Sequence, residues 1–394
     1  MKILFVTPVV PTETDGRRPF NFIRYLSQHH EVHLISLKME VQSAEDAERI
    51  RAWGIPVETV EIIKPYSIFN CAVGCLKGQP LRVSWTHYPE MSRRIEEALR
   101  RHRYDIVHFD RMRMGQYAPF VDVPRVLDFT DSLMMYFERS TRFRRKWGEW
   151  LIDRWEMLTV PSFERWVLNY LDAAIVCSSI DAGVFRDYHP EHEFHVIENA
   201  VDSEQFRVRT KKEKEPFTCV ITGTLFYFPN IDSVRYYREE ILPRLREKYP
   251  DLRTLIIGTR PTREMQKLHG EQGIELLPGV PHMQEHLYQD DIYLCPLRVA
   301  AGIRNKLLEA MSAGMPIVTT RLGAEGLNLT HEREVLFAET PEEFVFQVER
   351  LHSSPYLRQT LSEGARNYVL RHHQLESLGR KLEQLYEQVL KNYR

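Results

Sequence analysis

One stretch decides the fold of this chain: Ala300-Ala301-Gly302-Ile303-Arg304-Asn305-Lys306-Leu307-Leu308-Glu309-Ala310-Met311-Ser312-Ala313-Gly314-Met315-Pro316-Ile317-Val318. Its middle part predicts a helix, because apolar residues recur at helical spacing at Leu307, Leu308, Ala310 and Met311. Gly314 and Pro316 end that helix. Apolar runs at 292–297 and 317–320 predict a buried strand on either side. The order strand, glycine-containing loop, helix, strand is a βαβ unit, which indicates a parallel sheet.

The loop before this helix predicts an anion site. It places Gly302, Arg304 and Lys306 at the helix N-terminus, where free N–H groups and the helix dipole already favour negative charge. Acidic residues would suit this end of a helix better, so the two basic residues indicate a bound phosphate. Glu309, about one turn further on, can accept hydrogen bonds from the hydroxyls of a ribose. The alternative is a solvated surface helix in which Glu309 pairs with Lys306.

The same residues carry a resemblance to a known family. Glu309 and the residues after it, 310–318, are similar to the donor-site signature of the retaining GT-B glycosyltransferases of family 4, which have a Glu-x7-Glu pattern. The position of the first Glu holds Ala301 here. The version of the motif resembles the bacterial exopolysaccharide-type sugar transferase branch. This resemblance implies a hexosyltransferase of polysaccharide biosynthesis that moves a sugar from a nucleoside-diphosphate sugar to a hydroxyl acceptor. It also implies that Gly302 and Ile303 contact the donor.

Composition limits the possible classes of protein. The chain has 394 residues, of which 43% are apolar and 27% charged, so it is long enough for two globular domains. A formal net charge of −2 argues against nucleic acid as a partner. The five cysteines are scattered and odd in number, which favours a reduced, cytoplasmic compartment. We expect no bound metal, because no His, Cys or Asp cluster has metal-ligand spacing.

The alternation of apolar runs and helical patterns occurs twice along the chain. We therefore expect an α/β protein with two Rossmann-like domains that face each other across a cleft, the GT-B arrangement. The expected boundaries are 1–200 for the N-terminal, acceptor-side domain and 201–370 for the C-terminal, donor-binding domain. The charged stretch 207–216 suits a linker. In the family the C-terminal helix, here 371–394, crosses back to the first domain.

Two loops of the second half join the predicted donor site. Gly223 and Thr224 follow a strand at 218–223, and Gly223 would let the backbone approach a phosphate or sugar closely. Val280 and His282 lie between a strand and a helix predicted at 283–289, where the family contacts the nucleobase. The alternative for both loops is an ordinary turn with nothing bound.

Two loops of the first half are candidates as well. Gly16, in Thr14-Asp15-Gly16-Arg17-Arg18, resembles the glycine of the family loop near the sugar diphosphate and acceptor. The stretch Asp128-Phe129-Thr130-Asp131 ends a strand, which would place a carboxylate, Asp131 or Asp128, at the rim of the cleft. Many family members have a histidine near this place. We assign Asp131 to the catalytic group with Arg304 and Lys306. The alternative for these aspartates is a helix N-cap. His108 and Asp110 end the preceding strand, where a lone histidine more often has a structural role than one facing the cleft.

The predicted co-substrate is a UDP- or GDP-sugar, with no tightly bound cofactor. Two alternatives remain open: a non-catalytic protein that binds nucleotide sugars, and a nucleotide-sugar epimerase on the same fold. The long helical stretch 134–170 mixes basic and aromatic residues, above all at 137–147. We therefore consider peripheral contact with the inner face of the membrane, although packing against the first domain is the other possibility.

Overall fold

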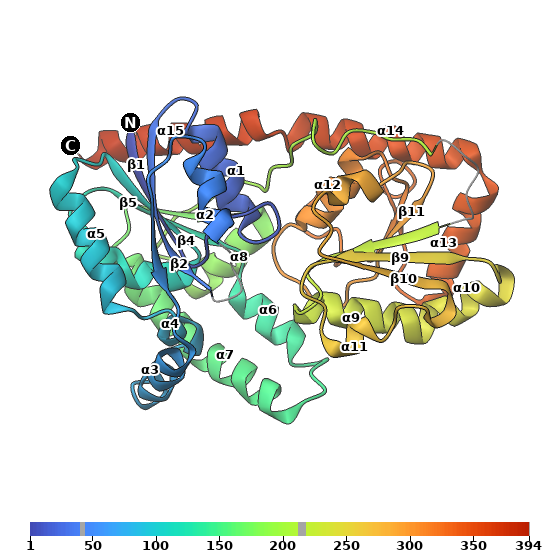
Figure 1. Cartoon of the computed structure of the whole chain (residues 1–394), viewed down its shortest axis with the longest axis horizontal. Coiled ribbons are helices and arrows are strands. Elements are labelled where there is room, and N and C mark those ends of the chain that lie inside the picture. The colour runs from blue at the N-terminus through green and yellow to red at the C-terminus, as the bar shows by residue number, and fades with distance from the viewer. Residues whose placement is uncertain (40–43, 212–217, 394) are drawn as a thin grey trace. The chain divides into compact units, whose positions relative to one another are not determined.

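The computed structural model describes residues 1–39, 44–211 and 218–393. The chain divides into two compact units, Met1–Glu198 together with the chain from Leu375, and Asn199–Gln374 (Figure 1). The expected linker stretch 207–216 lies partly outside the described residues. Each unit is an α/β domain, and the predicted fold class is confirmed.

The first unit is built on a seven-stranded sheet among the described residues, with the strand order β3-β2-β1-β4-β5-β6-β7. All neighbouring strands are parallel. The strands are β1 (Lys2–Thr7), β2 (Glu31–Lys38), β3 (Val57–Glu61), β4 (Ile106–Asp110), β5 (Arg125–Thr130), β6 (Ala173–Val176) and β7 (Phe194–Val196). The order turns back between β1 and β4, because β2 and β3 continue on one side of β1 and the later strands on the other.

Helices connect these strands. They are α1 (Arg17–Leu26), α2 (Ala44–Arg51), α3 (Lys64–Leu76), α4 (Leu81–Trp85), α5 (Pro89–Arg101), the 3-10 helix η1 (Met112–Phe120), α6 (Leu133–Ser140), α7 (Trp147–Leu168), α8 (Ser179–Tyr188) and the C-terminal α15 (Leu375–Tyr393). Helix α15 packs on α1, where the Tyr25 ring lies against Gly379. Its Tyr386 hydroxyl is also 2.8 Å from His108 Nδ1 on β4. The C-terminal helix therefore belongs to the first unit, as the family resemblance implied.

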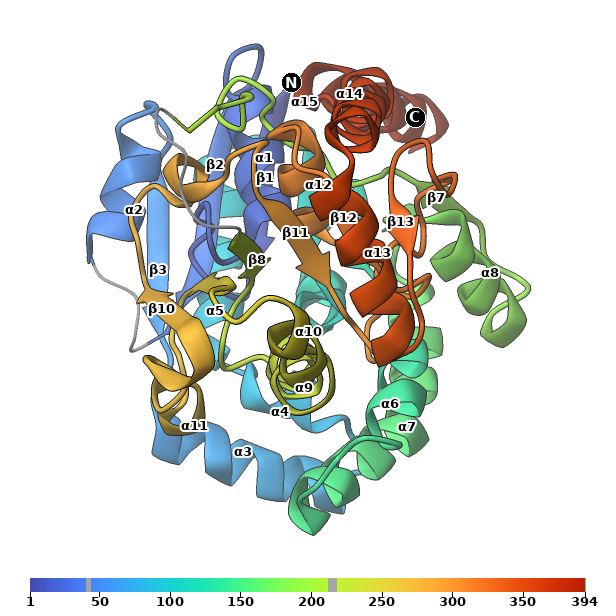
Figure 2. The ribbon, with the colours of Figure 1, turned by 90° about the vertical axis from the view of Figure 1, so that its right-hand side faces the viewer.

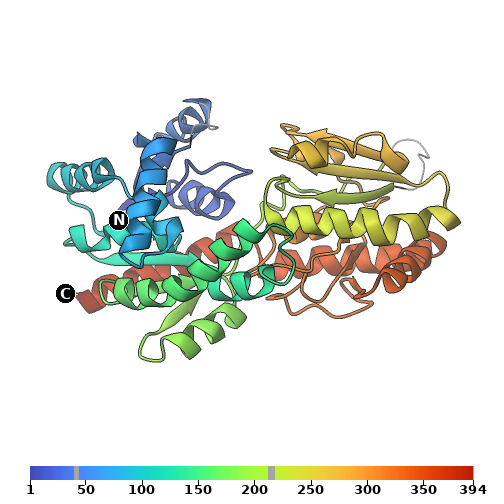
Figure 3. The ribbon, with the colours of Figure 1, turned by 90° about the horizontal axis from the view of Figure 1, so that it is seen from below.

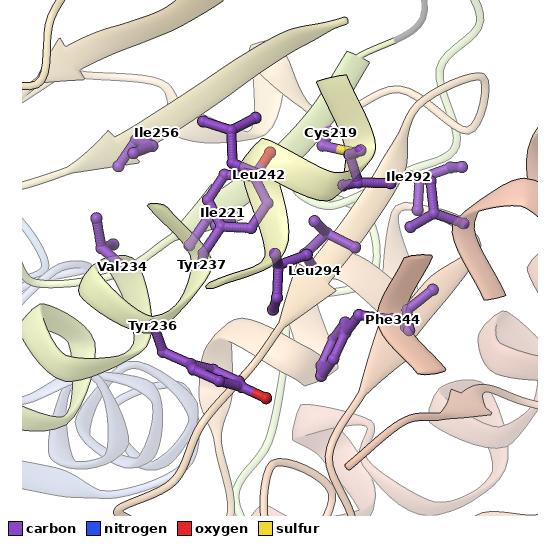
Figure 4. Packing of buried hydrophobic residues seen from close by; sticks show 14 of the residues in the cluster. Cys219, Ile221, Val234, Tyr236, Tyr237, Leu242, Ile256, Ile292, Leu294 and Phe344 are labelled. Carbon is purple, nitrogen blue, oxygen red and sulfur yellow. The ribbon is translucent and has the colours of Figure 1, made fainter. Parts of the chain in front are cut away.

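The second unit holds, in its described part, a six-stranded sheet in the order β10-β9-β8-β11-β12-β13, again parallel throughout. The strands are β8 (Thr218–Thr222), β9 (Arg253–Gly258), β10 (Ile274–Pro278), β11 (Ile292–Cys295), β12 (Ile317–Thr319) and β13 (Leu336–Phe337). Here the order turns back between β8 and β11. Apolar side chains of this sheet, among them Ile221 and Leu294, pack on Tyr237 and Phe344 from the covering helices (Figure 4).

The helices of the second unit are α9 (Phe228–Tyr236), the π-helical η2 (Tyr237–Ile241), α10 (Leu242–Lys248), α11 (Arg263–Gln266), η3 (Glu271–Gly273), η4 (Met283–His286), α12 (Asn305–Ser312), α13 (Pro341–Ser353) and α14 (Pro355–His372). Figure 3 shows α9, η2 and α10 following one another as one continuous helix, drawn in yellow. The helix predicted at 283–289 is only the short 3-10 helix η4, which ends at His286.

The long helix expected over 134–170 is interrupted. Helix α6 ends at Ser140 and α7 begins at Trp147. The Ser140 hydroxyl donates to Asp153 Oδ2 at 2.6 Å and Arg144 donates to the same carboxylate at 2.7 Å, so the turn between the helices is held by α7 itself. Helices α3 and α4 and the 3-10 helix η1 were not predicted from the sequence. Both α3 and α7 lie on the lower side of the first unit in Figures 1 and 2.

Candidate functional site

The N-terminus of α12 has the geometry that the sequence predicted. Gly302 is buried with a φ of +72°, which a residue with a Cβ rarely adopts, and this turns the chain from β11 into the helix. The carbonyl of Ile303 accepts a hydrogen bond of 2.8 Å from Asn199 Nδ2. Arg304 is the N-cap residue, with an extended backbone and no capping by its side chain. The loop before α12 is therefore fixed by a glycine turn and a buried amide.

Arg304 holds a neighbouring loop of the same unit. Its side chain is 7% exposed, and Nη2 donates to the carbonyl of Leu322 and lies 3.6 Å from Glu325 Oε2. Both partners belong to the loop that follows β12. Arg304 therefore places a guanidinium group beside the helix N-terminus.

Lys306 joins three elements at the carboxyl edge of the sheet. Its Nζ donates to Asn230 Oδ1 at 2.8 Å, and Asn230 Nδ2 donates to the carbonyl of Thr224 at 3.0 Å. A Cβ at Gly223 would lie 2.7 Å from the Asn230 side chain, so the loop after β8 can close on α9 only with glycine at that position. Burial, with a contribution from Arg304, lowers the pKa of Lys306. A neighbouring anion would reverse that effect.

The bridging role of Asn230 was not predicted from the sequence. The residues that it connects come from the loop after β8, from α9 and from α12. Because β8 and β11 are adjacent and the strand order turns back between them, this network lies at the topological switch point of the sheet. Open α/β sheets bind their ligands at such a point, beyond the carboxyl ends of the strands.

A further basic residue near this point was missed. Arg298 follows β11, and its Nε and Nη2 atoms lie 3.1 and 2.7 Å from the two carboxylate oxygens of Asp232 on α9. Its guanidinium also stacks over the Tyr236 ring at 4.5 Å. The signal in the sequence was its place shortly after a buried strand. The bidentate pair fixes α9 against the end of β11.

Glu309 and the nucleobase candidates occupy different places in the same unit. Glu309 lies in α12 and is 2% exposed. Val280 and His282 follow β10, which is separated from β8 by β9. The turn there begins at Gly279, whose N–H donates to the carbonyl of Gly258 at 2.9 Å, and the His282 side chain is exposed. These residues share the carboxyl edge of the sheet with the Lys306 network.

Gly16 in the first unit has the conformation expected of a loop glycine. Its φ is +69°, and it forms the N-cap of α1 in the left-handed region. Arg18, two residues later, is buried and donates to Asp128 Oδ2 at 2.6 Å and to the carbonyl of Glu198 at 3.0 Å. The sequence-based placement of Asp128 at the rim of a cleft is therefore wrong, because its carboxylate is 1% exposed and paired with Arg18.

Asp131 lies in a distorted loop at the end of β5. A bulge separates Asp128 from Thr130, and Thr130 has a φ of +70°, which is uncommon for a residue with a side chain. The N-cap of α6 is Ser132, whose hydroxyl accepts from the N–H of Met135 at 3.3 Å. The alternative that Asp131 caps this helix is therefore wrong, and its catalytic role stays a prediction.

His108 is a structural residue in this fold. Its ring stacks on Phe5 at 4.6 Å between centroids and bonds Tyr386 of the C-terminal helix. Complete burial lowers its pKa to about 4, so it is neutral at physiological pH. Asp110, at the end of the same strand, is 1% exposed, and burial raises its pKa to about 6.

Two family models match most of the chain between them. The model for Glycosyltransferase Family 4 matches residues 16–205, and the model for Glycosyl transferases group 1 matches residues 216–354. These two ranges correspond closely to the two units.

Individual proteins agree with the family models. The chain is 31% identical to a subunit of human phosphatidylinositol N-acetylglucosaminyltransferase over 137 residues, which are 32% of this chain and 27% of that protein. It thus spans about a quarter of that relative's length. A glycosyltransferase from Rickettsia africae has a TM-score of 0.69, 13% identity and 99% coverage of both chains. Anabaena HepE, solved in complex with UDP, has a TM-score of 0.67 and 12% identity, covering 98% of this chain and 100% of that one.

Neither a membrane-spanning helix nor a group of three or more metal-ligating side chains occurs in the described ranges 1–39, 44–211 and 218–393.

Proposed function

Because the chain belongs to the family 4 type of GT-B glycosyltransferases, we propose that it transfers a sugar from a nucleoside-diphosphate sugar to a hydroxyl acceptor, with retention of the anomeric configuration. The observation that carries this proposal is the hydrogen-bonded network of Lys306, Asn230 and Thr224. It puts a partly desolvated cation at the switch point of the second sheet, next to the N-terminus of α12. A diphosphate suits both the charge and the free N–H groups of such a place.

Charge development explains the roles of the residues. When the bond from the anomeric carbon to the diphosphate oxygen breaks, negative charge grows on the leaving group. Lys306 and Arg304 stabilise that charge more strongly in the transition state than in the ground state, and this difference lowers the barrier. The acceptor oxygen forms its bond on the face that the diphosphate leaves. Its proton passes to the leaving diphosphate oxygen, so that a separate side-chain base is not required. Asp131 completes the proposed catalytic group in the first unit.

The remaining donor contacts follow from the same unit. Glu309 accepts hydrogen bonds from the ribose hydroxyls, Val280 and His282 lie against the nucleobase, and Gly302 and Ile303 with Gly223 give the backbone close access to the phosphates and sugar. Gly16 contacts the donor or acceptor from the first unit. The HepE complex with UDP supports a UDP-sugar over a GDP-sugar as donor.

Two exposed apolar surfaces support peripheral binding to a membrane. On α7, Trp147 is 75% and Leu158 72% exposed, and on α3, Phe69 is 63% and Leu76 90% exposed. Helix α3 contains Lys64 as its only charged residue. The name of the human relative includes phosphatidylinositol, a lipid, as the molecule that it acts on. We propose that these helices bring the chain to an anionic bilayer at the inner face of the membrane.

Ala301, at the position of the first Glu of the motif, is the reason to test two alternatives, a non-catalytic nucleotide-sugar-binding protein and an epimerase. A protein without the first Glu of the motif could bind a nucleotide sugar without transferring it, or could isomerise the sugar as an epimerase does. The experiment is a panel of UDP-, GDP- and dTDP-sugars, tested for binding by thermal shift and for turnover by analysis of the sugar product. We expect binding and sugar release with at least one donor, and a product glycoside of the same anomeric configuration as the donor.

Matched variants assign that binding to the proposed site. Lys306→Gln should weaken donor binding, whereas Lys248→Gln should not, because Lys248 is an exposed residue paired with Glu349. Binding without sugar loss would favour the non-catalytic protein, and a 2-epimer would favour the epimerase. Failure of all three nucleotides to bind would overturn the proposal.

A further inference from the structure

The switch point of the first sheet carries a cluster of arginines that no proposed step uses. The strand order turns back between β1 and β4. Asp15 lies in the loop after β1, and Arg111 follows β4 directly, with Arg111 Nη2 4.0 Å from Asp15 Oδ1. The two loops thus meet at the crevice where an open α/β sheet binds its ligand.

The backbone at Arg111 is strained. Its φ is 66° and its ψ is 145°, a region that residues with a side chain seldom adopt. Two hydrogen bonds hold it there, from its N–H to the carbonyl of Asp128 at 2.7 Å and from the N–H of Met114 to its carbonyl at 2.9 Å. Such strain persists where the surrounding structure imposes it, and it gathers at ligand sites. Here it turns the chain from β4 into η1, the helix that carries Arg113.

Arg113 is a half-buried cation without an ion pair among the described residues. Its Nε is shielded from solvent and has no hydrogen-bond partner within the described part of the chain. Burial, and then the charges of Arg111 and Arg82, lower the pKa of Arg113 to about 9, and these effects outweigh the opposite influence of Asp110 and Asp15. A guanidinium in this position is more costly than one in water.

Arg82 is a rigid neighbour. Its guanidinium lies over the ring of Phe137 at 4.8 Å and over that of Tyr136 at 5.5 Å. Its backbone N–H donates to Glu156 Oε1 at 2.9 Å. The two ring contacts hold the guanidinium, and its charge acts on Arg113.

The carboxylates in the cluster do not balance the three arginines. Burial raises the pKa of Asp110 to about 6, and Asp110 Oδ2 lies 3.7 Å from Arg111 Nε. Asp15 Oδ1 lies 4.0 Å from Arg111 Nη2. Glu156, next to Arg82, is a third carboxyl group, and burial raises its pKa. The three arginines therefore face two close carboxylates and one carboxyl group that resists ionisation.

We propose that Arg113, with Arg82 and Arg111 beside it, binds a phosphate group carried by the acceptor substrate. That the ligand is an acceptor rests on the proposed function, whereas the affinity for phosphate rests on the cluster alone. A phosphate brings the negative charge that balances the cluster, and the planar guanidinium donates two parallel hydrogen bonds to its oxygens. The phosphate could belong to a soluble sugar phosphate or to a lipid headgroup.

The test is the affinity of the full-length chain for α-glucose 1-phosphate, measured by calorimetry with UDP present to occupy the donor site. Arg113→Gln should weaken this binding roughly 10- to 100-fold, as expected for a lost charge-assisted hydrogen bond. The matched control is Arg100→Gln on α5, whose side chain is 75% exposed and paired with Glu96. It should leave the affinity within about twofold of the original, the range expected for an exposed pair.

A melting curve shows whether Arg113→Gln folds. Because the substitution removes a half-buried charge without an ion pair, we expect a melting temperature no lower than that of the original chain. Arg113→Lys should recover part of the affinity, since the charge returns without the planar donors. An affinity for glucose 1-phosphate that is unchanged in Arg113→Gln would overturn the inference. The inference would also be overturned if the original chain bound neither glucose 1-phosphate nor the vesicles described next.

Vesicles separate the two sources of phosphate. Arg113-dependent sedimentation with phosphatidylcholine vesicles that contain phosphatidic acid would support a lipid headgroup, and Arg113-dependent binding of glucose 1-phosphate alone would support a soluble acceptor. The binding of UDP reports separately on the proposed function. Phosphate binding through Arg113 without nucleotide-sugar binding would support this inference and contradict the proposed function. UDP binding through Lys306 without phosphate binding through Arg113 would support the proposed function and contradict this inference.

Discussion

Lys306 Nζ and Asn230 Oδ1 lie 2.8 Å apart, and this hydrogen bond joins the N-terminus of α12 to the start of α9. Asn230 uses its other amide atom to hold the carbonyl of Thr224. The position of the Lys306 ammonium is therefore restricted by the Asn230 side chain, which is itself hydrogen-bonded to the loop after β8. A preorganised cation costs little reorganisation when charge develops on a leaving group.

This relationship predicts a graded series of variants. Lys306→Ala and Arg304→Ala should each lose roughly 2–4 kcal/mol of transition-state stabilisation, measured from kcat/KM for donor turnover. Asn230→Ala should lose less, about 0.5–1.5 kcal/mol, because it removes only the bond that aims the lysine. In the Lys306/Asn230 double variant the losses should not add, since the two residues act as one unit. Turnover within threefold of the original in both charge variants would contradict the assignment.

Glu309 gives a prediction about the ribose. Glu309→Gln keeps the size of the side chain and removes the charge of the acceptor, so donor affinity should fall by about 1–2 kcal/mol without loss of folding. A dideoxyribose donor analogue should bind the original chain about as poorly as the natural donor binds the variant. If the losses from the variant and from the analogue add, Glu309 does not contact the ribose.

His108 gives a prediction about pH. Its pKa falls from 6.5 in the unfolded chain to about 4 in the fold, so the folded state resists protonation. The stability that comes from a neutral His108 is therefore fully present above about pH 6.5 and is lost as the pH falls toward 4. The loss should amount to roughly 3 kcal/mol at about 1.4 kcal/mol for each pH unit. His108→Gln keeps a partner for the Tyr386 hydroxyl and cannot titrate.

Denaturant unfolding at pH 7 and pH 4.5 measures this difference. The free energy of unfolding should drop further for the original chain than for His108→Gln over that interval. Parallel drops in the two proteins would show that groups other than His108 dominate the acid response.

The sequence predicted those features that depend on neighbours along the chain. The turn at Gly302 and the helix after it could be predicted, because the glycine and the apolar spacing are local signals. The parallel direction of the strands in each sheet followed from the repeated alternation. The pairing of Arg18 with Asp128 could not be predicted, since the two residues are 110 positions apart and only the sheet brings them together. For the same reason Asp128 was placed wrongly at a rim.

Helix α3 was missed because its burial has little periodicity. Ser67 and Gly74 are its buried residues, while Phe69 and Leu76 face solvent, so the apolar residues do not form the stripe that indicates a packed helix. Arg113 was missed because its meaning depends on a strained neighbour and on Arg82 from a distant helix. An apolar helix face exposed to solvent and a half-buried cation without an ion pair are both features that appear only when the fold is known.

The exposed helices carry the last prediction, on membrane binding. The basic and aromatic residues at 137–147, which the sequence suggested would act together, divide into two groups. Phe137 is fully buried, and Arg144 is paired with Asp153 inside the turn between α6 and α7. The other group lies at the surface. It consists of the exposed Trp147 and the exposed basic residues of the turn before it, Arg142, Arg145 and Lys146. The basic turn and the apolar start of α7 form an amphipathic edge that suits an anionic lipid surface.

Charge reversal of Arg142, Arg145 and Lys146 to Glu should therefore abolish sedimentation with anionic vesicles. Each basic residue contributes about 1 kcal/mol near such a surface, so losing three should reduce the partition coefficient at least roughly 100-fold. The double variant Phe69→Ser, Leu76→Ser tests α3 in the same assay. It should weaken vesicle binding without changing the salt dependence of binding, because it removes apolar area that the bilayer would bury and removes no charge. Arg100→Glu on α5 is the control for a change of net charge alone. If the original chain does not bind anionic vesicles at low salt, both helices are exposed for another reason and the enzyme acts away from the membrane. Binding that persists in the Glu variants but disappears in the α3 variant would place the contact on α3 alone.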